Sequence, residues 1–358
     1  MSVQGPQAEG TAVPRNGSGP ASPASPPPRR RTSAWANTRT AVGNSPATPV
    51  YAALLGVFVI AWIIVTIDGG TFVTVDNIVG MLQRSVALGI VSAGQTVVIL
   101  AGSLDLSVAY LISLSSLLAA ETMDGQSANI VPAILAVLAL GVIVGLGNGL
   151  IVTKLRVNAF IATLGTGLII KGYMDDRYNG PAGSIPDTFE ELGYRRFGIL
   201  PLSVILLALV VVIIYLLLRY TRFGFRLYAV GGDEEVSRLS GVRTHRTIIA
   251  AHVVCSICAV LTGLFLASRL GSGTPTVGQE GGYDLESIAA VVLGGTALSG
   301  GRGGVLGTIG GVFILAVLDN TFNQLEVNAF LKDVVRGFII IAAVAVYARR
   351  TGPGRRQV

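Results

Sequence analysis

Residues 200–218 read LPLSVILLALVVVIIYLLL, a run in which no side chain carries a charge. A helix of roughly 20 apolar residues is long enough to cross the hydrocarbon core of a membrane, and this run has that length. Similar runs recur along most of the chain. The sequence therefore predicts an all-α fold, a polytopic bundle of membrane-spanning helices.

The composition excludes an ordinary soluble domain. Of 358 residues, 51% are hydrophobic and 13% are charged, a balance far more apolar than soluble chains show. The formal net charge is +6, but no basic groove interleaved with aromatic residues occurs, so nucleic acid is not expected as a partner. The two cysteines, Cys255 and Cys258, lie inside an apolar run. No disulfide framework is therefore expected.

Ten runs meet the requirement of roughly 17 to 25 residues for a transmembrane helix. We expect spans at about 51–67, 78–101, 105–121, 130–152, 158–173, 200–218, 247–268, 285–300, 304–322 and 334–348. The run at 285–300 is short and rich in Gly, so a re-entrant or broken segment is an alternative there. Two rows of glycines have the small-xxx-small spacing that lets membrane helices pack closely: Gly141, Gly145 and Gly149, and Gly303, Gly307 and Gly311.

The basic residues indicate which side each connection faces. With both chain ends in the cytoplasm, most of the 26 lysines and arginines lie on the cytoplasmic side, as the positive-inside rule requires. This topology gives a transmembrane domain at 51–350, a cytoplasmic loop at 219–246 and a cytoplasmic tail at 351–358. Residues 1–50 are rich in Pro, Ser, Ala and Gly, and they are predicted to form a disordered cytoplasmic tail. The first apolar run starts too late for a secretory signal and is predicted to be a retained anchor.

The cytoplasmic loop contains a predicted short helix, at 233–240 within the segment GGDEEVSRLSG of residues 231–241. Asp233 is suited to cap its N-terminus, and Gly241 is suited to the left-handed residue after its C-terminus. Glu234 stands four residues before Arg238, the spacing of a favourable ion pair on a helix. Val236 and Leu239 form an apolar stripe too narrow to bury itself. The helix is therefore either a capped surface helix that rests on its own protein or a handle for a partner protein.

Two Gly-containing segments interrupt the apolar runs. The first, AGSLDLS at 101–107, carries one carboxylate, and charge at membrane depth costs roughly 2.5 to 3.5 kcal/mol on insertion scales. It is either a cytoplasmic turn in which Ser103 or Asp105 caps the next helix, or a broken helix that lines a pathway. The second is GGTALSGGRGG at 294–304. Paired interruptions of this kind indicate a transport site between two halves of a membrane protein.

No catalytic or metal centre is expected. His252, Cys255 and Cys258 recur every third residue, but at about 100° per residue they spread around a helix, and no fourth ligand is evident. None of the lysines, Lys154, Lys171 and Lys332, follows a glycine as in a phosphate-binding loop. The chain is therefore not expected to bind ATP in that manner, and no cofactor is expected in it.

Six stretches of this chain resemble the ribose/xylose-type sugar permease family of bacterial ABC importers. They are GSLDLSV at 102–108, NGLIVTKL at 148–155, FIATLGT at 160–166, the segment 231–241, ASRLGSG at 267–273 and IAAVVLGGT at 288–296. Together they cover most of residues 80–345. The resemblance implies an inner-membrane permease that works as a pair of permease copies, with a cytoplasmic ATPase that binds ATP and Mg²⁺ and an extracytoplasmic sugar-binding protein.

On this comparison the helix at 233–240 matches the coupling helix that seats in the ATPase, through Asp233, Glu234, Glu235, Val236, Arg238, Leu239 and Gly241. The outer loops, including 174–199 and 271–284, are expected to receive the binding protein. Polar residues in spans tend to face a cavity or another helix. On that ground we expect the pathway to be lined by Gln95, Ser103, Asp105, Asn148, Thr163, Thr166 and Thr296.

The predicted function is inward transport of a monosaccharide by a multi-pass subunit of the bacterial plasma membrane that has no ATPase site of its own. Three alternatives stay open at this point. A permease for branched-chain amino acids or nucleosides would use the same motor. A secondary transporter would use an ion gradient, acting on Asp105 or Asp319. A membrane enzyme would need a catalytic cluster, and the sequence shows no such cluster.

Overall fold

The computed structural model describes residues 1–2, 5, 48–328, 330–332, 334–335, 337–338 and 341. The chain divides into two units, Met1–Gly43 and Asn44–Val358. Of the first unit only residues 1, 2 and 5 are described, so the predicted disordered tail lies almost entirely outside the described residues. The predicted tail at 351–358 and most of the expected span at 334–348 lie outside them too.

The second unit is built almost wholly from helices, as predicted. Its elements are α2 (Thr48–Ile67), α3 (Val75–Leu100), α4 (Val108–Met123), the 3-10 turn η1 (Ser127–Asn129), α5 (Ile130–Lys154), α6 (Ala159–Arg177), α7 (Asp187–Tyr194), the strands β1 (Arg196–Phe197) and β2 (Leu200–Pro201), α8 (Leu202–Tyr220), α9 (Arg222–Gly232), α10 (Glu234–Leu239), α11 (Thr244–Leu270), α12 (Val277–Glu280), α13 (Tyr283–Leu293) and α14 (Val305–Gln324). The strands form one antiparallel pair, with Arg196 opposite Pro201 and Phe197 opposite Leu200.

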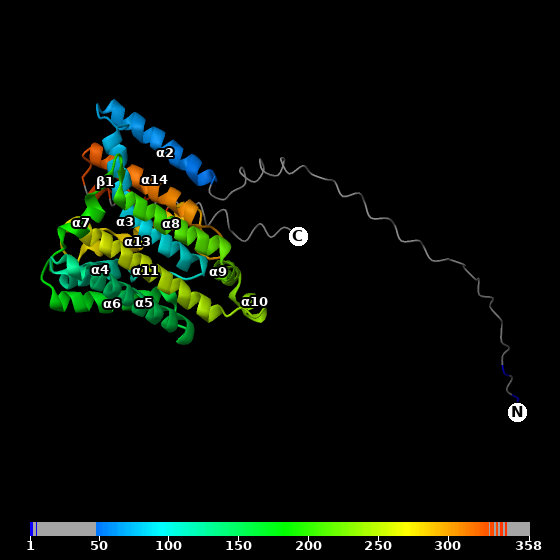
Figure 1. The fold of residues 1–358 in the computed structure, drawn as a ribbon. Helices are drawn as coiled ribbons and strands as arrows, with labels where there is room; N and C mark the ends of the chain where they lie inside the picture. The colour runs from blue at the N-terminus through cyan, green and yellow to red at the C-terminus, as the bar shows by residue number, and fades with distance from the viewer. Residues whose placement is uncertain are drawn as a thin grey trace. The chain divides into compact units, whose positions relative to one another are not determined.

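Six helical stretches among the described residues are long and apolar enough to cross a membrane: α2, α3, the stretch 127–154, α8, α11 and α14. They lie side by side in one bundle (Figure 1). Helices α4, α6 and α13 occupy three further predicted spans. The membrane bundle is thus confirmed, while the count of ten crossings stays a prediction.

The expected span at 285–300 is a broken segment. Helix α13 ends at Leu293, and no regular helix follows until α14 begins at Val305. The intervening residues include Gly295, Gly300 and Gly301 with φ between +72° and +86°, a backbone region that glycine enters without steric cost. The glycines of this segment therefore end the helix, so the prediction of a continuous span was wrong and the broken alternative holds.

Helix α11 is the centre of the bundle, and it packs most extensively against α5, α3 and α4. The glycine row of α5 makes this packing close, because a Cβ at Gly145 would lie 2.6 Å from the Cα of Val253 and one at Gly149 would lie 2.7 Å from the Cα of Ile249. Both distances are too short for a side chain. The predicted close helix packing is confirmed here.

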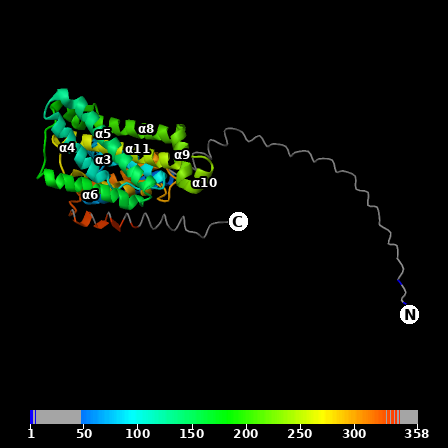
Figure 2. The same cartoon turned by 90° about the horizontal axis from the view of Figure 1, so that it is seen from below.

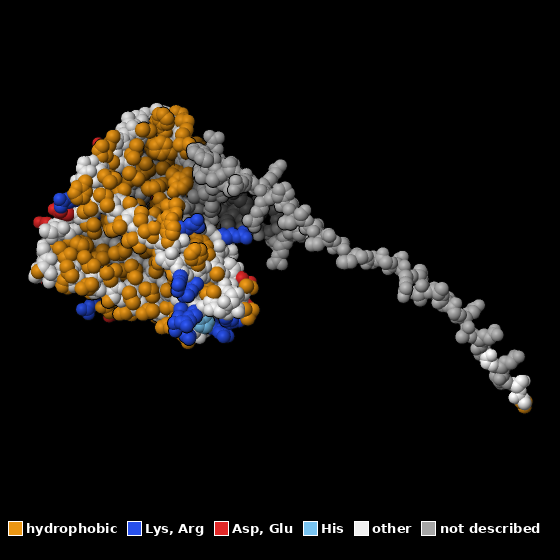
Figure 3. Space-filling model, turned by 45° about the vertical axis from the view of Figure 1, so that its right-hand side comes forward, with side chains coloured by type: hydrophobic (Ala, Val, Ile, Leu, Met, Phe, Trp, Pro, Cys, Tyr) orange, Lys and Arg blue, Asp and Glu red, His pale blue; other side chains and the backbone are white. Residues whose placement is uncertain are grey.

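The two ends of the bundle differ in charge. Helices α9 and α10 lie at one end in both views (Figures 1 and 2). This end, called the basic end below, carries a cluster of Lys and Arg side chains beside the apolar flank of the bundle (Figure 3). Its basic residues include Lys154, Arg156, Arg219, Arg222, Arg226, Arg238, Arg243 and Arg246. The opposite end holds α7, whose residues Asp187, Glu190 and Glu191 are acidic.

Candidate functional site

Helix α10 is held at its N-terminus by a side-chain cap. The Oδ1 atom of Asp233 accepts a hydrogen bond from the backbone N–H of Val236 at 2.9 Å, as predicted for an N-cap. Arg238 pairs with Glu235 at 3.1 Å. Glu234 was the expected partner, so that expectation is wrong: the arginine pairs with the carboxylate three positions before it.

The C-terminus of α10 is closed by backbone hydrogen bonds. The N–H of Gly241 donates to the carbonyl of Arg238 and the N–H of Val242 donates to that of Ser237, both at 3.0 Å. These two bonds make a Schellman motif, which requires a left-handed residue at the position of Gly241. Gly241 has φ of +83°, so its predicted conformation is confirmed. Both ends of α10 are thus fixed without help from another protein.

The apolar stripe of α10 points away from its own protein. Val236 is 57% exposed and Leu239 is 79% exposed, while Ser237 is the buried residue of the helix. Two exposed aliphatic side chains on a rigid helix at a charged end form a small surface that a partner's groove can bury. Of the two interpretations of the sequence, the geometry favours the handle for a partner.

Close backbone contacts join α9, just before α10, to both interruptions of the membrane runs. The N–H of Gly301 donates to the carbonyl of Leu100 at 3.0 Å. A Cβ at Gly231 would overlap that same carbonyl and lie 2.6 Å from the nitrogen of Gly301. A Cβ at Gly300 would lie 2.8 Å from the nitrogen of Gly102. We call Leu100–Gly102, Gly231–Gly232 and Gly300–Gly301 the glycine junction.

Substituting Gly231 with Ala is expected to force the glycine junction apart. The new methyl group meets backbone atoms that have no rotamer with which to move aside, and overpacking of this kind costs about 1–3 kcal/mol. Gly232→Ala is the matched control, because nothing lies within 4 Å of a Cβ there. Thermal unfolding of both variants in detergent measures the effect, and equal midpoints for the two would contradict the close contact at Gly231.

A buried polar cluster lies between the first interruption and two helices. Asp105 Oδ1 accepts hydrogen bonds from the backbone N–H of Ser107 at 2.9 Å and from its hydroxyl at 2.6 Å. Asn148 of α5 donates through Nδ2 to Ser107 Oγ at 2.9 Å. His252 of α11 places Nδ1 3.5 Å from Asp105 Oδ2 and Nε2 2.9 Å from the hydroxyl of Ser103. The cluster therefore ties the segment 101–107 to α5 and α11.

These contacts distinguish the two interpretations of segment 101–107, a capped turn and a broken helix. The residue at the N-cap of α4 is Ser107, and it makes no side-chain cap bond, so the expected cap by Ser103 or Asp105 is wrong. Asp105 is fully buried. His252 lies about 12 Å along the axis of α11 from its first residue, Thr244. The segment is thus a break within the bundle.

Sequence reasoning missed His252 as a member of this cluster. The spacing of His252, Cys255 and Cys258 was weighed only as a metal site and indicated no contact with Asp105. In the structure Cys255 instead donates its thiol to Gln95 Oε1 at 3.3 Å. Among the residues that the structure describes, no three His, Cys, Asp or Glu side chains are grouped as a metal site. One signal in the sequence could have indicated this contact. His252 and Asp105 each lie in an apolar stretch, and ionisable groups inside a membrane protein tend to pair with one another.

The other expected pathway residues are spread through the bundle. Thr163 accepts from the N–H of Leu106 at 3.0 Å and so touches the cluster from α6. Thr166 is half-buried, and its hydroxyl bonds the carbonyl of Ala162 in its own helix. Thr296 lies in the second interruption and accepts from the N–H of Gly304 at 3.2 Å. Of the predicted set, the structure brings together Ser103, Asp105 and Asn148, with Thr163 beside them.

At the end of the bundle opposite to the basic end, the two loops expected to bind a partner, 174–199 and 271–284, are joined. Ala182 and Gly273 exchange both backbone hydrogen bonds at 2.9 Å, which links the segment after α6 to the segment after α11. Burial, followed by the Glu121 carboxylate that accepts its hydroxyl at 2.7 Å, raises the pKa of Tyr178 to about 12. The phenol thus stays a donor at neutral pH and ties this surface to α4.

Comparison with known proteins identifies the family to which this chain is similar. Residues 77–344 match the family model described as branched-chain amino acid transport system / permease component. The ribose import permease protein RbsC of Escherichia coli K12 is 37% identical over 82% of this chain and 92% of its own length. RbsC of Bacillus subtilis is 37% identical over 83% and 92%, and the L-arabinose transport system permease protein AraH of E. coli K12 is 36% identical over 85% and 92%.

None of the solved structures compared with this chain matches it. The family model spans more than half of the chain, and the relatives are aligned over nearly their whole length. The chain belongs to the permease family of bacterial sugar ABC importers.

Proposed function

We propose that this chain is the membrane-spanning subunit of an ABC importer that moves a monosaccharide inward, powered by a separate ATPase. The observation that carries the proposal is the exposed pair Val236 and Leu239 on the doubly capped helix α10. As a member of the sugar permease family, the chain is a multi-pass protein of the inner membrane. Relatives named for ribose and arabinose import support a pentose-like substrate.

The charge of the two ends supports an orientation with the basic end in the cytoplasm. Positive residues are retained on the cytoplasmic side during membrane insertion, and α9, α10 and the connection from α5 to α6 all lie at the basic end. In this orientation α10 would lie on the side of the membrane where an ATPase works. Both chain ends in the cytoplasm and ten crossings complete the proposed topology.

In the proposed mechanism, α10 transmits movement to the bundle by two routes. Through α9 it reaches the glycine junction, where Gly231 abuts Leu100 and Gly301. Through α11 it reaches His252 and the polar cluster. A switch from 1:99 to 99:1 between two states requires roughly 5.5 kcal/mol of differential interaction, which the partner ATPase, holding ATP and Mg²⁺, would supply.

The burial of the expected pathway residues supports a closed state of the passage. Gln95, Asp105, Asn148, Thr163 and Thr296 have no exposed side-chain surface, so they do not border an open passage in this conformation. We infer that the passage opens when the segments held at the glycine junction separate. A second copy of the permease and an extracytoplasmic sugar-binding protein docked on the joined outer loops complete the importer.

No observation favours the alternatives over this function. The curated relatives reported above are named for sugars, although the family model carries the name of branched-chain amino acid transport. A secondary transporter would be independent of α10. A test at α10 therefore separates that alternative from the proposal.

Crosslinking from position 236 tests the proposed contact. The chain has two cysteines, and both are buried, so Val236→Cys introduces an accessible thiol. With a thiol-attached photo-crosslinker, this variant is expected to give an adduct with the ATPase in membranes that contain the whole importer. Leu270→Cys, 51% exposed at the opposite end, is the matched control and is expected to give none. An ATPase adduct from both positions, or from neither, would refute the coupling assignment.

A further inference from the structure

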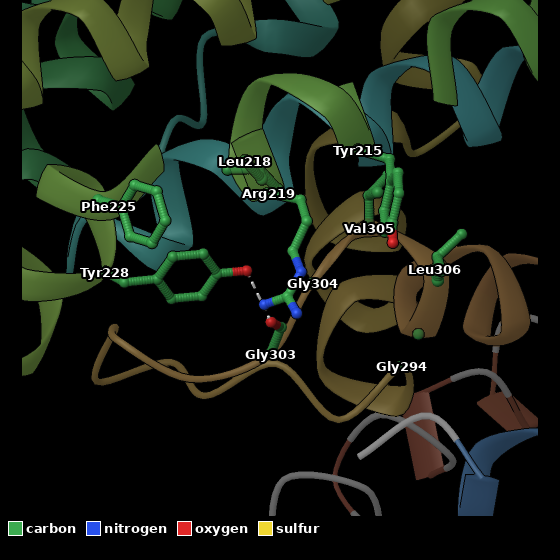
Figure 4. Close-up of a pocket in the computed structure, with 11 residues that line it drawn as sticks. Tyr215, Leu218, Arg219, Phe225, Tyr228, Gly294, Gly303, Gly304, Val305 and Leu306 are labelled. Atoms are coloured by element: carbon green, nitrogen blue, oxygen red, sulfur yellow. Dashed lines mark hydrogen bonds between the residues drawn. The ribbon is translucent and has the colours of Figure 1, made fainter. Parts of the chain in front are cut away.

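A cavity of about 560 Å³ opens at the basic end between α8, α9 and the start of α14. Leu218 and Phe225 form one part of its wall, and Val305 and Leu306 form another (Figure 4). The glycines that line it, Gly294, Gly303, Gly304 and Gly307, leave its floor without side chains. This cavity is separate from the polar cluster at Asp105 and from the exposed face of α10.

One cation projects into this apolar space. Arg219 extends its guanidinium toward Gly303 and Gly304 (Figure 4), and within the described part of the chain it has no carboxylate at ion-pair distance. Tyr228 donates its hydroxyl to the carbonyl of Gly303 at 3.0 Å, which occupies one of the two acceptor positions of that oxygen. Arg219 is itself exposed, so its guanidinium is accessible to an anion that enters the cavity.

In the proposed orientation, this cavity lies at the boundary between lipid and cytoplasm. Arg219 is in the last turn of the membrane-capable helix α8, and Val305 begins α14. The side chains of Phe225 and Leu306, which border the opening, are 67% and 45% exposed. Tyrosines occur at this depth in membrane proteins, and here Tyr215 and Tyr228 line the cavity. A molecule bound there would therefore need an anionic group for Arg219 near the solvent-exposed opening and apolar groups for the walls.

We propose that the cavity binds an anionic phospholipid of the cytoplasmic leaflet, with its phosphodiester on the Arg219 guanidinium and its acyl chains along the exposed apolar face beside Leu306. A guanidinium is suited to two parallel hydrogen bonds with phosphate oxygens. The lipid would bridge Arg219 of α8 to Leu306 of α14 next to the glycine junction, so its presence would stabilise the contact between those two helices.

Binding of phosphatidylglycerol to the purified chain tests this site. Native mass spectrometry of the chain in detergent, titrated with phosphatidylglycerol or with phosphatidylcholine, counts the retained lipid. Arg219→Gln is expected to weaken phosphatidylglycerol binding about fivefold, the contribution of one basic residue near an anionic membrane surface. Arg226→Gln, which removes the same charge on α9 outside the cavity, is the matched control and is expected to bind as the unsubstituted chain does.

Two further variants separate charge from shape. Leu306→Trp is expected to reduce binding by filling the cavity without changing the charge, and Arg219→Lys is expected to retain part of it. Equal binding by the unsubstituted chain and Arg219→Gln, or equal loss in Arg226→Gln, would overturn the proposal. So would equal retention of phosphatidylcholine, or full competition by soluble glycerol phosphate, which would assign the site to a free phosphate. The measurement needs no ATPase, so its outcome is independent of the proposed coupling.

Discussion

Replacing Leu239 with Asp is expected to abolish association with the ATPase, and with it ATP-driven uptake, while the bundle stays folded. Leu239 is 79% exposed, so its replacement removes no contact of the permease core. In a complex its side chain would fill an apolar pocket, and truncation of such a central residue typically costs about 3 kcal/mol, roughly a 100-fold loss of affinity. A buried, unpaired carboxylate adds to this cost.

Co-purification of the ATPase with a tagged permease measures this effect. Leu155→Asp is the matched control, since Leu155 is 70% exposed at the same end and lies outside α10. We expect the control to retain the ATPase and Leu239→Asp to lose it, with unchanged helical content in both. Retention of the ATPase by Leu239→Asp would show that α10 is not the contact.

Replacing Asp105 with Ala is expected to cause the largest loss of stability, about 3 kcal/mol or more. The carboxylate accepts two hydrogen bonds from Ser107 and faces His252 and Asn148. Its removal leaves several buried donors without an acceptor, and each such group costs about 1–3 kcal/mol. The cluster holds the start of α4 to α5 and α11, so the loss is expected to appear as a lower unfolding temperature in detergent.

Thr166→Ala is the control for a polar residue outside the cluster, because the Thr166 hydroxyl donates to the carbonyl of Ala162 in its own helix. We expect its midpoint to stay near that of the unsubstituted chain. In a double-mutant cycle, Asp105→Ala should cost less when His252 is already Ala, because the two groups share one network. Additive losses would contradict the contact between Asp105 and His252.

The helices could be predicted from the sequence because each depends on a local pattern. Uncharged apolar runs such as 200–218 gave the long spans, and the cap residues Asp233 and Gly241 gave the short helix between them. Such signals lie within a few residues of the element that they specify. The interruption at 101–107 was also visible locally, because glycine, hydroxyls and a carboxylate interrupt an apolar run there, although the sequence left a turn and a broken helix as alternatives.

The contacts between distant segments could not be predicted in the same way. The pair of His252 and Asp105 joins residues 147 positions apart, and no spacing rule connects them. The glycine junction likewise brings Leu100, Gly231 and Gly301 together from three separate parts of the chain. Both features depend on how α11 and α9 are packed, which composition and periodicity do not determine.

The end of α13 was predicted wrongly from a local apolar pattern. The residues 288–293 are apolar, and the sequence favoured extending their helix to residue 300. Gly295, Gly300, Gly301 and Gly303 instead adopt positive φ angles. Gly294 has φ of −69° and no side chain, so it meets Gly307 of α14 at backbone contact distance. Close packing between α13 and α14 therefore outweighs helix continuation.

Transport by the purified chain in liposomes tests the central claim most directly. The account predicts that the permease accumulates a labelled monosaccharide against its gradient only when the ATPase, the binding protein and ATP are all present. It also predicts that Leu239→Asp removes that accumulation. Uphill uptake by the permease alone, driven by a proton or sodium gradient, would contradict the claim that this chain depends on a separate ATPase engaged through α10.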